Sequence, residues 1–316
     1  MRPLTQSLLW RSFKRIAADP VRREIAQTCN RGRIPLAYCG IPNWGDALNP
    51  VLVELLSGRK VQHLNGFYND RYMAIGSILE GANSRAEVWG SGFAKEGASV
   101  LQPPRVVHAV RGPLSRANLL NAGIECPQVY GDPALLLPRF FNPPATQRYE
   151  IGIIPHFIDK GHSWVEQYRD NPQIRIIDIE SGTGSFVMAV KSCSVILSSC
   201  LHGLICADAY GIPNAWIKLS DILLGGNFKF RDYRLSINAE EPVPIDVRSD
   251  PSLDEVVSKA NFHKLQIDLR KLLLACPFLH PQLRKEVESA PSRSCGVPEI
   301  FSSRLCDSAR FNKLFA

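Results

Sequence analysis

Short apolar runs alternate with helical segments along most of the chain from residue 34 onward, and this alternation constrains the fold more than any other feature. Apolar runs that break at Gly, Pro or Asn are typical of buried strands, and the segments between them have the length of crossover helices. Such alternation predicts parallel sheets covered by helices. The expected strands are residues 34–39, 60–64, 73–76, 88–90, 106–110, 150–154, 174–179, 195–198 and 214–219.

A proline-rich stretch from Pro138 to Pro144 divides this pattern into two series. At 316 residues the chain also exceeds the usual size of a single hydrophobic core. We therefore predict an α/β fold of two Rossmann-like domains facing across a cleft, with extra N- and C-terminal helices. The predicted parts are an N-terminal amphipathic helix (1–28), an N-terminal domain (29–145), a C-terminal domain with a crossing helix (146–285) and a C-terminal tail (286–316).

Two of these helices are predicted from amphipathic periodicity. Residues 1–18 place large apolar side chains on one face, with basic residues beside it. This helix either packs on its own protein or lies on anionic lipid, and both alternatives stay open. The second helix, from Leu253 to about Ala275, is expected to pack across both domains.

Charge and cysteine usage limit the classes of partner. The formal net charge is +7 with a pI near 9.0, which suits acidic partners such as phosphorylated small molecules or an anionic membrane face. No motif of a nucleic-acid-binding protein is present, so no nucleic-acid partner is expected. The nine cysteines include no C-x-x-C pair, so we expect reduced thiols, no metal site and a cytoplasmic location, with peripheral contact to the inner membrane face through residues 1–18.

Polar residues concentrate at strand-to-helix junctions. The turn from Asn43 to Asp46 precedes a helix, so Asp46 is either an N-cap or a carboxylate aimed at a substrate hydroxyl. Arg111 ends a buried strand, where its guanidinium would either clamp a carboxylate or phosphate or form a salt bridge between domains. His202 lies in the first turn of a helix that follows Ser198 and Ser199, and it is either structural or catalytic.

Motifs in a fixed order resemble the polysaccharide pyruvyltransferase family, and within it the succinoglycan type. The similarity covers roughly residues 34–235. It is carried by Asn43-Trp44-Gly45-Asp46, Ile75-Gly76-Ser77, Trp89-Gly90-Ser91-Gly92, Val110-Arg111-Gly112-Pro113, Gly131-Asp132-Pro133, Ile154-Pro155-His156, Ser198 to Gly203, Gly211-Ile212-Pro213 and Phe228 to Tyr233.

This resemblance implies a GT-B-like arrangement, phosphoenolpyruvate as the donor substrate, a lipid-linked oligosaccharide as the acceptor, and no cofactor. The family's functional positions match Asp46, Arg111 and His202, with Lys218 a looser match. Many members carry arginine where this chain has Cys200, two residues before the histidine. The missing positive charge would then come from a basic residue downstream, for which the candidates are Lys218, Lys229 and Arg231.

The chemistry assigns a role to each of the three matched residues. We predict that His202 is the general acid, that Asp46 is the base for a sugar hydroxyl, and that Arg111 clamps the donor carboxylate. The expected substrate-binding residues are Asn43, His156, Ser199, Lys218, Lys229 and Arg231. Two rivals remain open: a GT-B glycosyltransferase that uses a nucleotide sugar, and a non-catalytic subunit of the polysaccharide machinery.

Overall fold

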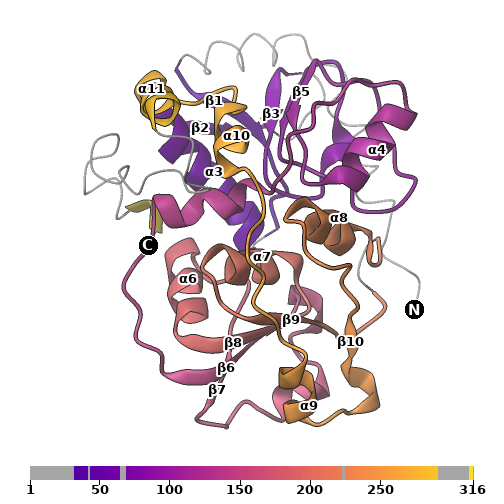
Figure 1. Ribbon diagram of the computed structural model, residues 1–316, viewed down its shortest axis with the longest axis vertical. Coiled ribbons are helices and arrows are strands. Elements are labelled where there is room, and N and C mark those ends of the chain that lie inside the picture. The colour runs from indigo at the N-terminus through magenta and orange to yellow at the C-terminus, as the bar shows by residue number, and fades with distance from the viewer. Residues whose placement is uncertain (1–31, 42, 65–68, 223–224, 291–312, 316) are drawn as a thin grey trace.

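The computed structural model describes residues 32–41, 43–64, 69–222, 225–290 and 313–315. Its described part holds two bodies, each built on one parallel sheet, with helix α7 (Leu201–Ala209) between them (Figure 1). The predicted N-terminal helix (1–28) lies outside the described residues, as does most of the predicted tail (286–316).

The first sheet has five parallel strands in the order β2-β1-β3-β4-β5. The strands are β1 (Ile34–Ala37), β2 (Val61–His63), β3 (Arg71–Met73), β4 (Ala86–Trp89) and β5 (Val106–Ala109). The accompanying helices are α3 (Trp44–Ser57), η1 (Leu79–Gly81), α4 (Pro113–Asn121) and η2 (Pro133–Arg139).

The second sheet is also parallel and five-stranded, in the order β10-β9-β8-β6-β7. Its strands are β6 (Tyr149–Ile154), β7 (Ile174–Ile176), β8 (Cys193–Ser198), β9 (Asn214–Lys218) and β10 (Ile245–Asp246). Besides α7, its helical segments are η3 (Phe157–Asp159), α5 (Ser163–Glu166), α6 (Thr183–Lys191), α8 (Phe228–Ser236), η4 (Val247–Ser249) and α9 (Leu253–Ser258).

Both sheets follow one topology, because numbering the strands of each by chain order gives 2-1-3-4-5 in both. In doubly wound sheets of this order, ligands bind beyond the carboxyl ends of the strands where the order reverses, between strands 1 and 3. Those switch points are β1/β3 in the first sheet and β6/β8 in the second. The predicted fold class, two Rossmann-like domains with parallel sheets, is confirmed.

Helix α3 is attached to the second sheet as well as to its own. The backbone N–H of Trp44 donates to the carbonyl of Ile179 at 2.7 Å, and its indole Nε1 donates to the carbonyl of Thr183 at 3.2 Å. The Trp44 ring also packs on Phe186 of α6, with 5.2 Å between ring centroids. The N-terminus of α3 is therefore held against the second half of the molecule.

The C-terminal chain returns to the half of the molecule that holds the first sheet through α10 (Leu269–Leu274) and α11 (Pro281–Ser289) (Figure 1). Trp89 Nε1 donates to the carbonyl of Leu272 at 2.8 Å, and the backbone N–H of His280 donates to the carbonyl of Leu56 at 2.9 Å. The predicted tail boundary at residue 286 falls inside α11.

The prediction of one long helix from Leu253 to about Ala275 is wrong. Helix α9 ends at Ser258, and α10 begins only at Leu269. Between them, Asn261 forms an antiparallel bridge with Asn214 of β9, through backbone hydrogen bonds of 2.9 and 3.1 Å. This pairing with β9 takes up the backbone groups that a continuous helix would need.

Candidate functional site

His202 occupies the first turn of α7, directly beyond the carboxyl end of β8. Its imidazole lies flat against Gly45 of α3: a Cβ added at Gly45 would lie 2.1 Å from Nδ1 and 2.4 Å from Cγ of the ring. The contact therefore needs a residue without a side chain at position 45. It joins the switch point of the second sheet to the helix that follows β1.

The Nε2 atom of His202 points at the carboxylate of Asp132, the N-cap residue of η2. Nε2 and Oδ2 are 3.8 Å apart, and both atoms are buried without a hydrogen-bond partner among the described residues. The other oxygen, Oδ1, accepts from the backbone N–H of Ala134 at 3.0 Å. Burial raises the pKa of Asp132 to about 6, against the opposing effects of the Ala134 N–H and of Arg111.

Asp46 lies one residue beyond Gly45 and is nearly buried. It does not cap α3, because Asn43 is the N-cap: Oδ1 of Asn43 accepts from the backbone N–H of Asp46 at 3.2 Å. The Asp46 carboxylate instead accepts from the backbone N–H of Cys39 at 3.1 Å and from Nδ2 of Asn43. Burial raises the pKa of Asp46 to about 6.

The structure distinguishes the three candidate cations. Lys218 pairs with Asp221, and Arg231 pairs with Glu241, in ion pairs whose acidic partners are exposed. Lys229 of α8 has no hydrogen-bond or ion-pair partner among the described residues. Its ammonium lies 5.5 Å from the ring centroid of Phe230.

The charge of Lys229 acts on the residues around His202. It lowers the pKa values of His202 and His156 and opposes the burial that raises the pKa of the Cys200 thiol. Burial in turn lowers the pKa of Lys229 itself, with Arg111 adding to that effect. Of the three candidates, Lys229 is the cation beside Cys200.

Arg111 is completely buried and paired with Asp232 of α8, both side chains having no exposed surface. Its Nε and Nη2 lie 3.1 and 3.0 Å from Oδ2 of Asp232, while Nη1 donates to Ser77 Oγ and Nη2 to the carbonyl of Phe93, both at 2.6 Å. The salt bridge that the sequence left open as an alternative is therefore present. The role of carboxylate clamp stays a prediction.

Two further predicted residues join the carboxyl ends of β6 and β8. The hydroxyl of Ser199 accepts from the backbone N–H of His156 at 2.8 Å, and Nδ1 of His156 accepts weakly from the N–H of Ile158. Burial, followed by the charge of Lys229, lowers the pKa of His156 to about 4.

Burial and neighbouring positive charges favour the neutral imidazole of His202. Burial is the largest cause of the lowered pKa of His202, about 3, and the charges of Lys229, Arg111 and His156 add to it. The described residues contain no cluster of three or more His, Cys, Asp or Glu side chains arranged to hold a metal ion.

The structure thus brings Asp46, His156, Ser199, His202 and Lys229 together, and it places Lys218 and Arg231 in separate surface ion pairs. Asp132 received no role from sequence reasoning, although its motif was part of the family resemblance. An aspartate that directly precedes a proline is a typical N-cap, and the position of Asp132 between Gly131 and Pro133, just after Val129 and Tyr130, was the available signal.

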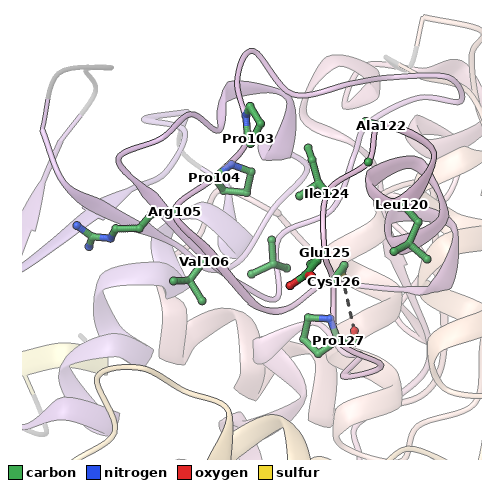
Figure 2. Close-up of a pocket in the computed structure, with 12 residues that line it drawn as sticks. Pro103, Pro104, Arg105, Val106, Leu120, Ala122, Ile124, Glu125, Cys126 and Pro127 are labelled. Carbon is green, nitrogen blue, oxygen red and sulfur yellow. Dashed lines mark hydrogen bonds between the residues drawn. The ribbon is translucent and has the colours of Figure 1, made fainter.

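A separate hollow of the described surface lies away from His202. Figure 2 shows it beside the edge strand β5 and the loop after α4, where it has a volume of about 780 Å³. It is lined by Arg105, Val106, Leu120 and Glu125 among others, and by none of the residues around His202. No described helix combines the length and the apolar character needed to cross a bilayer.

Comparison with known proteins agrees with the motifs. The family model for polysaccharide pyruvyl transferase matches residues 64–221. An uncharacterized protein of Acanthamoeba polyphaga mimivirus is 30% identical over 203 residues, covering 60% of this chain and 69% of that protein. The succinoglycan biosynthesis protein ExoV of Rhizobium meliloti is 25% identical over 224 residues, covering 66% of each.

The chain therefore spans about two thirds of the length of these curated relatives. Among solved structures, an uncharacterized protein from Klebsiella pneumoniae aligns with a TM-score of 0.38 and 10% identity, covering 72% of this chain and 99% of that one. At that TM-score the likeness carries no argument.

Proposed function

The chain belongs to the polysaccharide pyruvyl transferase family, and on that premise we propose that it transfers the pyruvyl group of phosphoenolpyruvate to a hexose of a lipid-linked exopolysaccharide repeat unit. The product is a cyclic pyruvate ketal, and inorganic phosphate is released. The observation that carries the proposal is the meeting of the His202 imidazole with the Asp46-bearing end of α3 and the ammonium of Lys229.

The reaction needs one proton at carbon and two new C–O bonds. His202 delivers a proton to the methylene carbon of the donor, and the electron pair of the double bond forms the new C–H bond. The adjacent carbon then has oxocarbenium character and accepts the first sugar hydroxyl, whose proton passes to Asp46. The second hydroxyl displaces phosphate, which takes up the remaining proton. General acid catalysis of this kind contributes roughly 10²–10⁴-fold.

The charge of the site couples proton loading to donor binding. Burial and the neighbouring cations lower the pKa of His202 to about 3, so the imidazole is neutral at pH 7. A bound carboxylate and phosphate would offset those cations and favour the imidazolium. Asp46, with a pKa of about 6, is mostly ionised at pH 7 and is able to accept a proton.

Lys229 is our candidate for the positive charge that other family members place at the position of Cys200. It has no partner among the described residues, and it acts electrostatically on both Cys200 and His202. Arg111 contributes its field from a buried ion pair. Direct contact between Arg111 and the donor carboxylate would require its pair with Asp232 to open.

The remaining predicted residues keep supporting roles in this proposal. Asn43 orients Asp46, and the Ser199 hydroxyl fixes the backbone at His156 beside the site. Lys218 and Arg231 each have a carboxylate partner, and in this proposal they bind the outer part of the acceptor.

Release of phosphate tests the proposal. Purified protein is incubated with phosphoenolpyruvate and lipid-linked oligosaccharides, and in parallel with nucleotide sugars. We expect phosphate from phosphoenolpyruvate and a ketal on the glycan, and we expect His202→Ala to abolish both while His263→Ala, a histidine outside the site, behaves as wild type. Turnover of a nucleotide sugar but not of phosphoenolpyruvate would refute the proposal in favour of a glycosyltransferase.

A further inference from the structure

One ring nitrogen of His202 and one carboxylate oxygen of Asp132 face each other, and neither has a hydrogen-bond partner among the described residues. Asp132 has no exposed surface, and its Oδ2 lies 3.8 Å from Nε2 of His202. Buried polar groups almost always have a hydrogen-bond partner, because an unpaired one has lost its bonds to water and gained none in the protein. An unpaired acceptor 3.8 Å from an unpaired ring nitrogen points to a hydrogen bond between them that shortens when the substrate binds, since catalytic hydrogen bonds often tighten only in the substrate complex.

The surroundings hold both groups in place. Asp132 is fixed by the hydrogen bond from the Ala134 N–H to Oδ1 and by the packing of the following residue, Pro133, against Gly90, where an added Cβ would meet the proline ring at 2.4 Å. The opposite side of the imidazole rests on Gly45. The ring therefore has little freedom to turn Nε2 away from the carboxylate.

The two ring nitrogens differ in their access to solvent. Nε2 is buried, whereas 13% of the His202 side chain is exposed. The accessible part of the ring therefore lies away from Nε2. A reactant approaching the imidazole reaches this accessible edge, which leaves Nε2 free to bond with Asp132.

We propose that Asp132 is a positioning residue for His202: its Oδ2 accepts a hydrogen bond from Nε2–H, and this fixes the tautomer that leaves Nδ1 to carry the catalytic proton. The inference rests on the proposed function, in which His202 is the general acid. During the reaction the Nδ1 proton moves to the methylene carbon, where the electron pair of the double bond forms the new C–H bond. The ring becomes neutral and keeps the proton on Nε2, which still donates a hydrogen bond to Asp132. Which nitrogen is protonated is set by the partner of the other.

The charged groups around His202 and Asp132 define what the Asp132 carboxylate does to the pKa of His202. Lys229, Arg111 and His156 all act to lower the pKa of His202. Asp132 is the carboxylate within 4 Å of the ring, and it opposes them when ionised. Arg111 in turn favours the ionised form of Asp132, while burial disfavours it. The charge of Asp132 also contributes to the raised pKa of the buried Tyr233, whose hydroxyl donates to Asp208 Oδ2 at 2.7 Å.

Asp132→Asn tests the proposal because it keeps the shape and the oxygen that caps η2 but replaces Oδ2 by an amide. We expect kcat to fall by at least about 10-fold and the KM for phosphoenolpyruvate to stay within about twofold. The alkaline limb of the pH profile should move to lower pH by about one unit or more, because the imidazolium loses its counter-charge. Asp246→Asn is the matched control: Asp246 also caps a short 3₁₀ helix, η4, but is exposed and outside the site.

Wild-type kcat with an unshifted alkaline limb in Asp132→Asn would overturn the proposal, while ketal formation by wild-type protein would leave the proposed function standing. A second measurement does not depend on the variant folding. In ¹⁵N-histidine-labelled wild-type protein at pH 8, assigned with His202→Gln, the neutral ring of His202 should carry its proton on Nε2. A proton on Nδ1 instead would also overturn the inference.

Discussion

Replacing Gly45 by alanine has two opposed physical effects, a gain in helix propensity and a clash with His202. The structure indicates that the clash determines activity. Gly45 lies in the first turn of α3 with a helical backbone, where alanine is intrinsically favoured over glycine by about 0.5–1 kcal/mol in a helix interior. Helix propensity alone therefore predicts a protein that is at least as stable as the wild type.

The contact with His202 predicts the opposite for catalysis. The new Cβ would lie 2.1 Å from Nδ1, 2.2 Å from Cε1 and 2.4 Å from Cγ of the ring, whereas ordinary contact begins at 3.4 Å. The imidazole must therefore retreat by about 1.3 Å, and a misplacement of roughly 1 Å in a catalytic group costs about 10²-fold in rate. We expect kcat to fall about 100-fold, or about 2.7 kcal/mol of transition-state stabilisation.

Phosphate release with saturating phosphoenolpyruvate measures kcat, and thermal unfolding reports on the fold. Gly81→Ala is the matched control, because Gly81 also lies in a helical turn, the 3₁₀ helix η1, but has nothing within 4 Å of an added Cβ. It should leave both quantities unchanged. Wild-type kcat in Gly45→Ala, with an unfolding midpoint equal to or above that of the wild type, would mean that His202 does not lie on Gly45 during turnover.

Two further predictions concern the cations of the site. Lys229→Ala should raise the KM for phosphoenolpyruvate at least about 10-fold, since a charge-assisted contact is worth about 1.5–3 kcal/mol. Lys218→Ala should leave this KM near the wild-type value. Equal effects of the two substitutions in initial-rate kinetics would contradict the assignment of Lys229. Asp232→Ala strands Arg111 as an unpaired buried charge and should lower the free energy of unfolding by about 3–5 kcal/mol, measured by urea denaturation. The exposed control Asp246→Ala should cost less than about 1 kcal/mol, and a similarly small loss in Asp232→Ala would show that Arg111 finds another partner.

The sheets were predictable from the sequence because their signal is local. Each strand is a short apolar run, such as Ile151 to Ile154, closed by residues that favour a turn, and burial in a parallel sheet requires such runs. The positions of Asp46 and His202 followed from the same rule, because each residue lies in the first turn of a helix that follows a predicted strand. A parallel sheet gathers the residues that follow its strands at one edge.

Long-range pairing was not predictable in this way. The helix expected from Leu253 onward has the right local periodicity, but Asn261 finds a backbone partner in β9 that no local pattern reveals. Arg111 meets Asp232 across 121 residues of chain, and its choice between a substrate and a salt bridge depends on that distant residue. Lys229 could be distinguished from Lys218 and Arg231 as the candidate cation only once the acidic partners of Lys218 and Arg231 were known.

The contacts that build the site are also contacts that join the two halves of the molecule. Trp44 bonds to Ile179 and Thr183 of the second half, and its neighbour Gly45 supports His202. A substitution that loosens the junction therefore alters stability and catalysis together, and loss of activity alone cannot identify a catalytic residue here. Gly45→Ala tests the contact with the ring because Gly81→Ala reports the effect of replacing a glycine where an added Cβ meets nothing. If the ring must rest on Gly45 to hold its proton toward the donor, kcat falls in Gly45→Ala and not in Gly81→Ala.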